Sequence, residues 1–174
     1  MYHEEVAKWA ADHLRTHIRP YLDEVNARFD DGTTLTTPKG IEVASEVGGT
    51  FTMFDEILPQ YGIDILSKVF SDGVDLYPYL YSGQINGMVN GQSRQAVDKM
   101  ITRHSSAVEL FIRRHEVAHE FSTDDFRILE IGFDGVQFSG AEDLGEVDGR
   151  ELWIAGFSID FSLLTSEDGP GQHG

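Results

Sequence analysis

Two kinds of hydrophobic spacing alternate along this chain, and their order constrains the fold more than any other feature. Apolar residues recur every three or four positions over residues 3–29, which predicts an amphipathic helix with one face on a core. Pro20 removes a backbone donor there, so we expect either a kink near Arg19 or a long helix followed by a short one. Residues 94–119 have the same spacing and predict a second helix, with Ser93 as its N-cap.

Strands are predicted where residues of two kinds alternate with a period of two. Residues 61–69, 126–133 and 151–164 have this pattern, and residues 77–89 have it most clearly. Pro78 cannot donate a hydrogen bond to a neighbouring strand, so we expect the start of that strand at a sheet edge or a β-bulge. One face of the same strand carries tyrosines and small or apolar residues: Tyr77, Tyr79, Tyr81, Gly83, Ile85, Gly87 and Val89.

Other segments are assigned less directly. Residues 41–47 and 50–54 are candidates for short strands, with Gly48 and Gly49 as a turn between them. Residues 135–140 either continue the strand before them or pair with it. The next ten residues, 141–150, are acidic and contain glycine, so we interpret them as a loop.

The order helix, strands, helix, strands predicts the fold class. We expect an α+β fold with a largely antiparallel sheet, and with the N-terminal helix and the long central helix packed on one face. The chain is interpreted as one domain, residues 1–164, in which residues 33–50 form a loop or short-strand insertion. Residues 165–174 are expected to form a flexible acidic and glycine-containing tail.

The charge of the chain limits its partners. Thirty Asp and Glu residues against thirteen Lys and Arg give a net charge of −17, which repels nucleic acid and anionic membranes. No stretch has the ~20 consecutive apolar residues of a membrane span, and the first residues do not form a signal peptide. The absence of cysteine excludes disulfide bonds and thiolate metal sites.

One short motif suggests a reaction. His115, Glu116 and His119 have the H-E-x-x-H spacing, which on a helix would place two imidazole ligands for Zn²⁺ on one face and a general base between them. Arg113 and Arg114 directly precede the motif, and two cations beside a metal site weaken metal binding.

A third protein ligand for the metal is not evident either. The metzincin continuation needs Gly and His after the motif, and the chain has Ser122 and Asp125 at those positions. We therefore interpret the motif as a chance match, and we expect no catalytic residue, no metal and no cofactor. A zinc-dependent hydrolase stays as an alternative in which His115 and His119 bind the metal.

The order of the predicted elements, and the residues that they contain, suggest a family. A glycine- and tyrosine-rich strand precedes the helix that begins at Ser93, a hairpin follows near residues 126–140, and the terminal strand reads ELWIAGFSIDFSLL. In these respects the chain resembles the tail-terminator proteins of long-tailed phages and related viruses, which have the lambda-type tail-completion fold. The resemblance extends over residues 4–164, with residues 33–50 as an insertion.

This resemblance implies a virion structural protein that is made in the host cytoplasm and located in the tail or neck. Such proteins form a homo-hexameric ring that caps the tail tube and meets the head-completion or connector protein, while genome DNA passes without specific binding. Ring contacts are heterologous, and partly wet contacts suit tyrosine, so Tyr77, Tyr79 and Tyr81 are candidate interface residues. Another neck, connector or tube protein is the main alternative.

Overall fold

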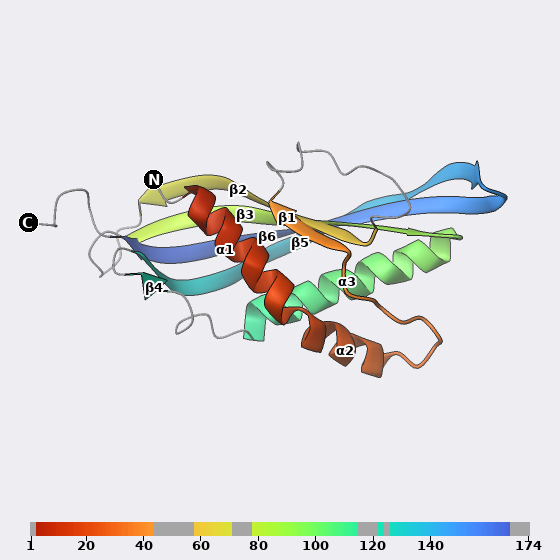
Figure 1. Cartoon of the computed structure of the whole chain (residues 1–174), viewed down its shortest axis with the longest axis horizontal. Coiled ribbons are helices and arrows are strands. Elements are labelled where there is room, and N and C mark those ends of the chain that lie inside the picture. The colour runs from red at the N-terminus through yellow and green to blue at the C-terminus, as the bar shows by residue number, and fades with distance from the viewer. Residues whose placement is uncertain (1–2, 44–57, 71–77, 115–121, 124–125, 168–174) are drawn as a thin grey trace, which may run out of the picture.

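A computed structural model describes residues 3–43, 58–70, 78–114, 122–123 and 126–167 of the chain, and all structural statements below concern these residues. They form an α+β fold with one six-stranded sheet, which confirms the predicted fold class (Figure 1). The sheet has the order β1-β2-β3-β6-β5-β4, and every pairing is antiparallel except that of β1 with β2. The elements are α1 His3–His17, α2 Arg19–Arg28, β1 Gly40–Val43, β2 Gln60–Phe70, β3 Pro78–Gly91, α3 Arg94–Arg114, β4 Ser122–Thr123, β5 Phe126–Val147 and β6 Arg150–Glu167.

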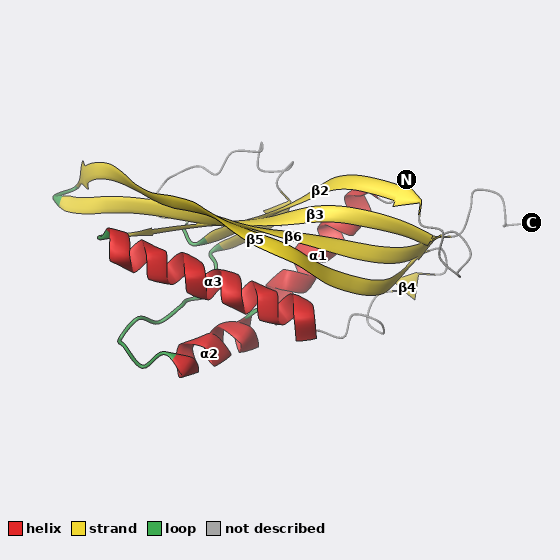
Figure 2. Ribbon diagram, turned by 180° about the vertical axis from the view of Figure 1, so that it is seen from behind, coloured by secondary structure: helices red, strands yellow, loops and turns green. Residues whose placement is uncertain are grey.

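The helices cover one face of the sheet and leave the other face bare (Figure 2). The first predicted helix divides into α1 and α2, with Pro20 in the first turn of α2, as one of the two expected arrangements requires. Helix α1 packs on β1 and β2, and α3 packs on β3, β5 and β6. Apolar side chains of the predicted N-terminal stripe are buried against the sheet and α3: Val6, Trp9, Leu14, Ile18, Leu22 and Val25.

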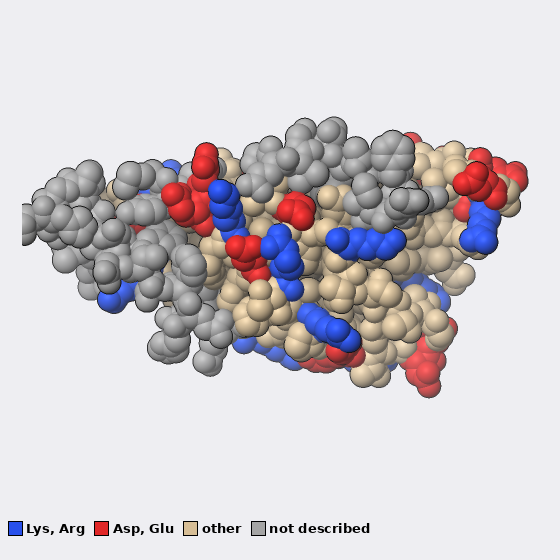
Figure 3. All heavy atoms as spheres, viewed as in Figure 1, with Lys and Arg blue, Asp and Glu red and all other residues tan. Residues whose placement is uncertain are grey.

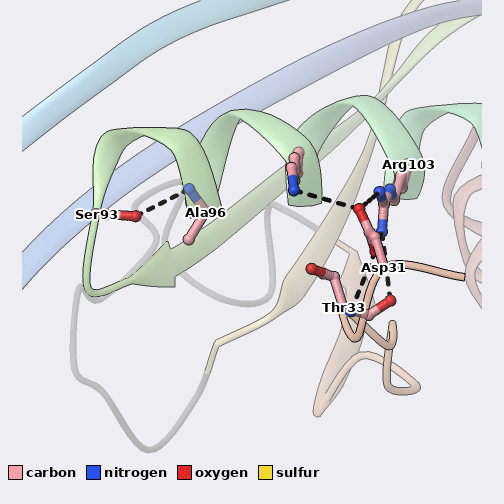
Figure 4. Close-up of polar contacts among 6 residues, drawn as sticks. Asp31, Thr33, Ser93, Ala96 and Arg103 are labelled. Carbon is pink, nitrogen blue, oxygen red and sulfur yellow. Dashed lines mark hydrogen bonds and ion pairs between the residues drawn. The ribbon is translucent and has the colours of Figure 1, made fainter. Parts of the chain in front are cut away.

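Helix α3 begins as predicted. The backbone N–H of Ala96 donates to the hydroxyl oxygen of Ser93 at 3.1 Å, so Ser93 is the N-cap (Figure 4). Its predicted stripe is buried at Val97, Ile101, His104, Val108, Phe111 and Ile112. The described helix ends at Arg114, and the last five residues of the predicted helix lie outside the described residues.

Glycines in β3 allow two phenylalanine rings from β6 to lie flat against the sheet. Gly83 pairs with Phe161 and Gly87 pairs with Phe157. A Cβ atom on Gly83 would lie 2.5 Å from the Phe161 ring, and one on Gly87 would lie 2.2 Å from the Phe157 ring. The alternation of tyrosine, glycine and isoleucine seen in the sequence is therefore a packing pattern, in which small residues make room for large ones on the next strand.

Strand β5 is much longer than predicted. Residues 141–147 continue it, so the prediction of an acidic loop at residues 141–150 is wrong. A two-residue turn at Asp148 and Gly149, with φ angles of 51° and 76°, joins β5 to β6. The end of this hairpin extends past the N-terminus of α3 (Figure 1). β-Bulges interrupt the β5–β6 register, between Ile128 and Glu130 for example, so Ile128 and Ile131 both face the core despite their odd spacing.

Two further predictions need correction. Strand β6 extends to Glu167, and Thr165 and Glu167 are buried, so the tail does not begin at residue 165 as expected. Strand β3 lies inside the sheet between β2 and β6, so the edge position expected as one possibility is wrong, and the bulge expected as the other lies in the partner strand β2, opposite Ser82 and Gly83. Pro78 is tolerated there because it is the first residue of β3, where only β6 pairs with it.

The remaining strand predictions fall partly outside the described residues. Strand β2 confirms the strand predicted at residues 61–69. Strand β1 confirms only the start of the one predicted at residues 41–47, and places it in the expected insertion. Residues 44–57, which include the candidate strand at 50–54, are outside the described residues. None of the described helices is long and apolar enough to span a membrane.

Candidate assembly surfaces

The tyrosines predicted to lie at a subunit interface occupy different environments. Tyr81 is completely buried, and its hydroxyl group donates to a carboxylate oxygen of Glu167, so the prediction that it contacts a neighbouring subunit is wrong. Burial raises the pKa of Tyr81, and the hydrogen bond to Glu167 raises it further. Tyr79 is half-buried beside Phe70, with ring centroids 5.8 Å apart. Tyr77 lies outside the described residues.

Lys68 connects this cluster to β2. Its ammonium group lies 2.6 Å from Oε2 of Glu167 and 4.1 Å from the centre of the Tyr79 ring. The Glu167 carboxylate is almost fully buried, and its two oxygens bind Lys68 and the Tyr81 hydroxyl group, so its charge is compensated. Because Lys68 is bound in this way, its charge does not project from the edge of β2.

The outer half of β2 carries exposed apolar side chains and, among the described strands, has a partner on one side only. Strand β1 pairs with β2 only as far as Val43 and Ile63, and no other described strand pairs with β2 on that side. Leu66, Val69 and Phe70 are 56%, 51% and 61% exposed. A long edge strand with exposed apolar residues and no projecting charge is a typical surface for pairing with another chain. We call residues 64–70 the β2 edge.

A second edge lies on the other side of the sheet. Strand β4 pairs with β5 only at Phe126 and Arg127, so from Ile128 onward β5 pairs with β6 alone among the described strands. The half-buried apolar residues along this part of β5 include Leu129, Ile131 and Phe133. We call residues 128–135 the β5 edge.

The bare face of the sheet is polar and contains few cations. Rows of paired residues on β3 and β6 present hydroxyl and amide groups there, and Gln84 donates a hydrogen bond of 2.9 Å to Asp160. Asp160 and Asp64 lie in one of these rows, on either side of Gln84. The pairing and alternation of the described strands place two cations on this face, Arg127 and, beside the hairpin turn, Arg150.

Charge is divided unequally between the two layers. Residues 3–43 and 94–114, which contain the helices, have ten Lys and Arg and ten Asp and Glu. The described residues from β2 to β6, without α3, have three Lys and Arg and ten Asp and Glu. The helix side therefore has no net formal charge, and Figure 3 shows its Lys and Arg side chains over the centre of that face. The acidic excess of the described residues lies on the sheet and its hairpin.

An ion pair fixes the segment after α2 on α3. The guanidinium group of Arg103 contacts both carboxylate oxygens of Asp31, at 3.0 and 2.5 Å, and Lys99 lies 3.2 Å from one of them (Figure 4). The backbone N–H of Thr33 also donates to Asp31. Arg103 and these other donors hold the pKa of Asp31 well below its usual range. This cluster is structural, because it joins two segments and satisfies its own donors and acceptors.

No catalytic arrangement is found among the described residues. They contain no group of three or more His, Cys, Asp and Glu side chains that could bind a metal ion. His13 stacks on Trp9, with ring centroids 4.8 Å apart, and His104 is buried beside Tyr61. The H-E-x-x-H motif at His115, Glu116 and His119 lies outside the described residues, so the zinc alternative is not tested there.

Comparison with protein-family models finds none that matches the chain, and comparison with curated proteins finds no match either. The candidate site is therefore defined by surface geometry alone. Leu66, Val69 and Phe70 were not predicted to be surface residues. A signal was available, because apolar residues occupy both faces of the end of β2 whereas a strand with one solvated face should alternate.

Proposed function

We propose that this chain is a virion structural protein of the tail-terminator type, a subunit of a homo-hexameric ring at the end of a viral tail tube. The ring would stop growth of the tube and offer a surface to the head-side connector. Its function would be mechanical, with no chemical step. Another ring-forming neck or tube protein is the nearest alternative, and it shares the same subunit geometry.

The observation that carries the proposal is the two-sided character of the sheet. One face is covered by helices, and the other is bare, polar and poor in cations. A single soluble subunit gains little from a bare, cation-poor sheet face, whereas a ring can turn that face toward a channel. Asp64 and Asp160 would then line the channel, and DNA would pass because the wall repels phosphate.

The acidic excess on the sheet is consistent with this orientation. A ring that turned its helix layer inward would present a layer of no net charge, whose ten Lys and Arg residues offer contacts to phosphate, whereas the sheet layer has an acidic excess that repels it. With the sheet inward, most of these cations face outward. Exposed Leu66, Val69 and Phe70 supply apolar surface for the heterologous contacts that a closed ring requires.

Mass and shape together test the proposal. Native mass spectrometry of the purified chain is expected to show a hexamer, and electron microscopy is expected to show rings with an open centre. Added to the tail-tube protein of the same virus during polymerisation, the chain is expected to shorten the tubes and to appear at their ends. A chain that stays monomeric alone and leaves tube length unchanged would contradict the proposal. Chelator-sensitive peptide cleavage would instead favour the zinc alternative.

A further inference from the structure

We infer that the acidic end of the β5–β6 hairpin of one subunit docks in a hollow on helix α3 of a neighbouring subunit. This inference rests on the proposed ring, and it adds a contact between the sheet layer of one copy and the helix layer of the next. The occupant of the hollow is therefore a second copy of this chain. Charge, exposed apolar surface and position in the fold support that choice.

The hollow lies on the side of α3 that is turned away from the buried stripe of that helix. It has a volume of about 640 Å³, and it is lined by Phe29 and by α3 residues between Arg94 and Arg103. Phe29 is 46% exposed, and Arg103 stacks on its ring at 4.3 Å, so the hollow offers apolar surface beside cations. We call it the α3 hollow.

Two cations of the α3 hollow are placed to contact another chain. The Arg94 side chain is 73% exposed, and its contact with Asp98 measures 3.8 Å, which is too long for a hydrogen bond. Lys99 is partly exposed and contacts Asp31 at 3.2 Å, and an ammonium group has three donors to offer. Arg103 is buried against Asp31, so it supports the hollow from inside.

The end of the hairpin carries the opposite charge. Residues 142–151, which we call the hairpin tip, have five Asp and Glu against one Arg, and so a net charge of −4. All six of these charged side chains are exposed. Val147 lies between Glu146 and Asp148 in the sequence and is 41% exposed, so the tip presents an apolar residue between two carboxylates. This order of groups matches a hollow in which an aromatic ring lies beside cations.

Charge limits the surfaces on which such a tip can bind. The rest of the described sheet has five Asp and Glu against two Lys and Arg, so it repels the tip. In the α3 hollow, three cations outnumber the two nearby carboxylates, Asp31 and Asp98. The α3 hollow is therefore a described surface that attracts the tip, and burial of Phe29 against Val147 would stabilise the contact.

The position of the tip directs it toward another copy. A Cβ atom on Gly91 would lie 3.1 Å from Val97, so the end of β3 lies against the first turn of α3. Gly91 pairs with Trp153, and Asp148 lies five positions further along the hairpin. At about 3.3 Å per residue, the hairpin therefore projects roughly 15 Å past the start of α3 (Figure 1).

The α3 hollow extends in the opposite direction, from Arg94 toward Arg103. The tip therefore points away from the hollow of its own subunit. Nine helical positions rise about 14 Å, so the hollow is about as long as the projecting part of the hairpin. Tip and hollow are different surfaces, so each copy gives one tip and receives one, as the heterologous contacts of a closed ring require.

Charge reversal on each side tests the contact. The tip variant carries Glu146→Lys and Glu151→Lys, and the hollow variant carries Arg94→Glu and Gln95→Glu, all at exposed positions. Sedimentation should show association at least about tenfold weaker for each variant alone, because like charges then meet. An equal mixture of the two variants should recover the natural association, because each altered tip then meets an altered hollow of opposite charge.

A matched control carries Glu4→Lys and Glu5→Lys, which change the same charge as the tip variant on exposed positions of α1. This control should associate like the natural chain. Circular dichroism checks that each variant is folded. A second measurement needs no charge change, because the natural chain contains no cysteine. Val147→Cys mixed with Gln95→Cys should give a covalent two-chain species with a short bifunctional maleimide, and Val147→Cys mixed with Glu4→Cys should not.

Each result has a distinct meaning. Rings that form as well from both charge variants as from the natural chain, or that lack the V147C–Q95C cross-link, would overturn this contact and leave the proposed function standing. Folded variants that associate weakly alone and also when mixed would overturn the contact as well. Recovery in the mixture together with the cross-link, but without rings, would support the contact and count against the hexamer. A natural chain that is monomeric at every concentration, with no cross-link, would overturn both.

Discussion

The hydroxyl group of Tyr61 lies 2.5 Å from Nδ1 of His104 in the buried layer between β2 and α3. Burial raises the pKa of Tyr61 well above 10.0 and lowers the pKa of His104 to about 4. Both groups are therefore neutral at pH 7, and the arrangement that leaves fewest groups unpaired has Tyr61 donating to Nδ1. The proton of His104 then resides on Nε2, which has no hydrogen-bond partner among the described residues.

This pair makes stability depend on pH. Because the pKa of His104 falls from 6.5 in the unfolded chain to about 4 in the folded one, the unfolded chain binds more protons between those values. The contribution of His104 to the free energy of unfolding is complete above pH 6.5 and falls by roughly 3 kcal/mol as the pH drops to 4. Denaturant titrations across this window should show less pH dependence in His104→Gln. Equal slopes for the two proteins would refute the assignment.

Alanine at Gly87 is expected to destabilise the fold by about 1–3 kcal/mol, because its Cβ would overlap the buried ring of Phe157. Gly140 is a matched control on the hairpin, because a Cβ there has no atom within 4 Å. Urea unfolding of Gly87→Ala and Gly140→Ala should separate the two sites, with Gly140→Ala within about 0.5 kcal/mol of the natural chain. Equal effects would mean that Phe157 can move aside freely.

Removing the charge of Asp31 should weaken the attachment of the segment after α2. The low pKa of Asp31 means that its contribution is present above pH 3.8, the ordinary value for Asp, and is lost as the pH falls below it. Thermal unfolding at pH 7 should give a lower midpoint for Asp31→Asn than for Asp30→Asn. Asp30 forms no ion pair with the described residues, so it controls for the loss of one negative charge. A similar midpoint for both variants would show that the Arg103 contact contributes nothing measurable.

A lysine at Val69 should prevent subunit association without unfolding the subunit. Val69 is 51% exposed, so the monomer tolerates the change, whereas a charge buried in an apolar contact between subunits opposes their association. Thr16→Lys adds the same charge on the exposed surface of α1 and serves as the control. Sedimentation should detect monomers only for Val69→Lys, with unchanged circular dichroism for both variants. Intact rings of Val69→Lys would place the subunit contact elsewhere.

The helices were predictable because the spacing of their apolar residues, and the residues that begin and end them, lie close together in the sequence. Pro20 marked the division of the first helix, and Ser93 marked the start of α3. The class of the fold followed from the order of the elements. The length of β5 did not follow, because four irregularities in its register and five exposed acidic residues hid its alternation and gave residues 141–150 the composition of a loop. The Asp148-Gly149 pair was the local signal for the hairpin turn.

The sequence predicted that the chain has a contact surface, but it did not predict which residues form that surface. The tyrosine-rich strand suggested a contact surface, yet Tyr81 is buried by Glu167 and Lys68, which are distant in sequence. Strand order decides which strands lie at the two sides of the sheet. Strand order in turn depends on contacts between residues far apart in the chain. A single sequence does not contain that information in a local form.

The turn at Asp148 and Gly149 has a consequence for how the chain folds. Both residues adopt positive φ, so the geometry of two residues sets the partner of every residue along β5 and β6. A slip by one position between β5 and β6 would turn β5 side chains such as Ile128 and Ile131 from the core to the bare side. An exposed two-residue turn at the end of the hairpin therefore governs which side chains of β5 reach the interior.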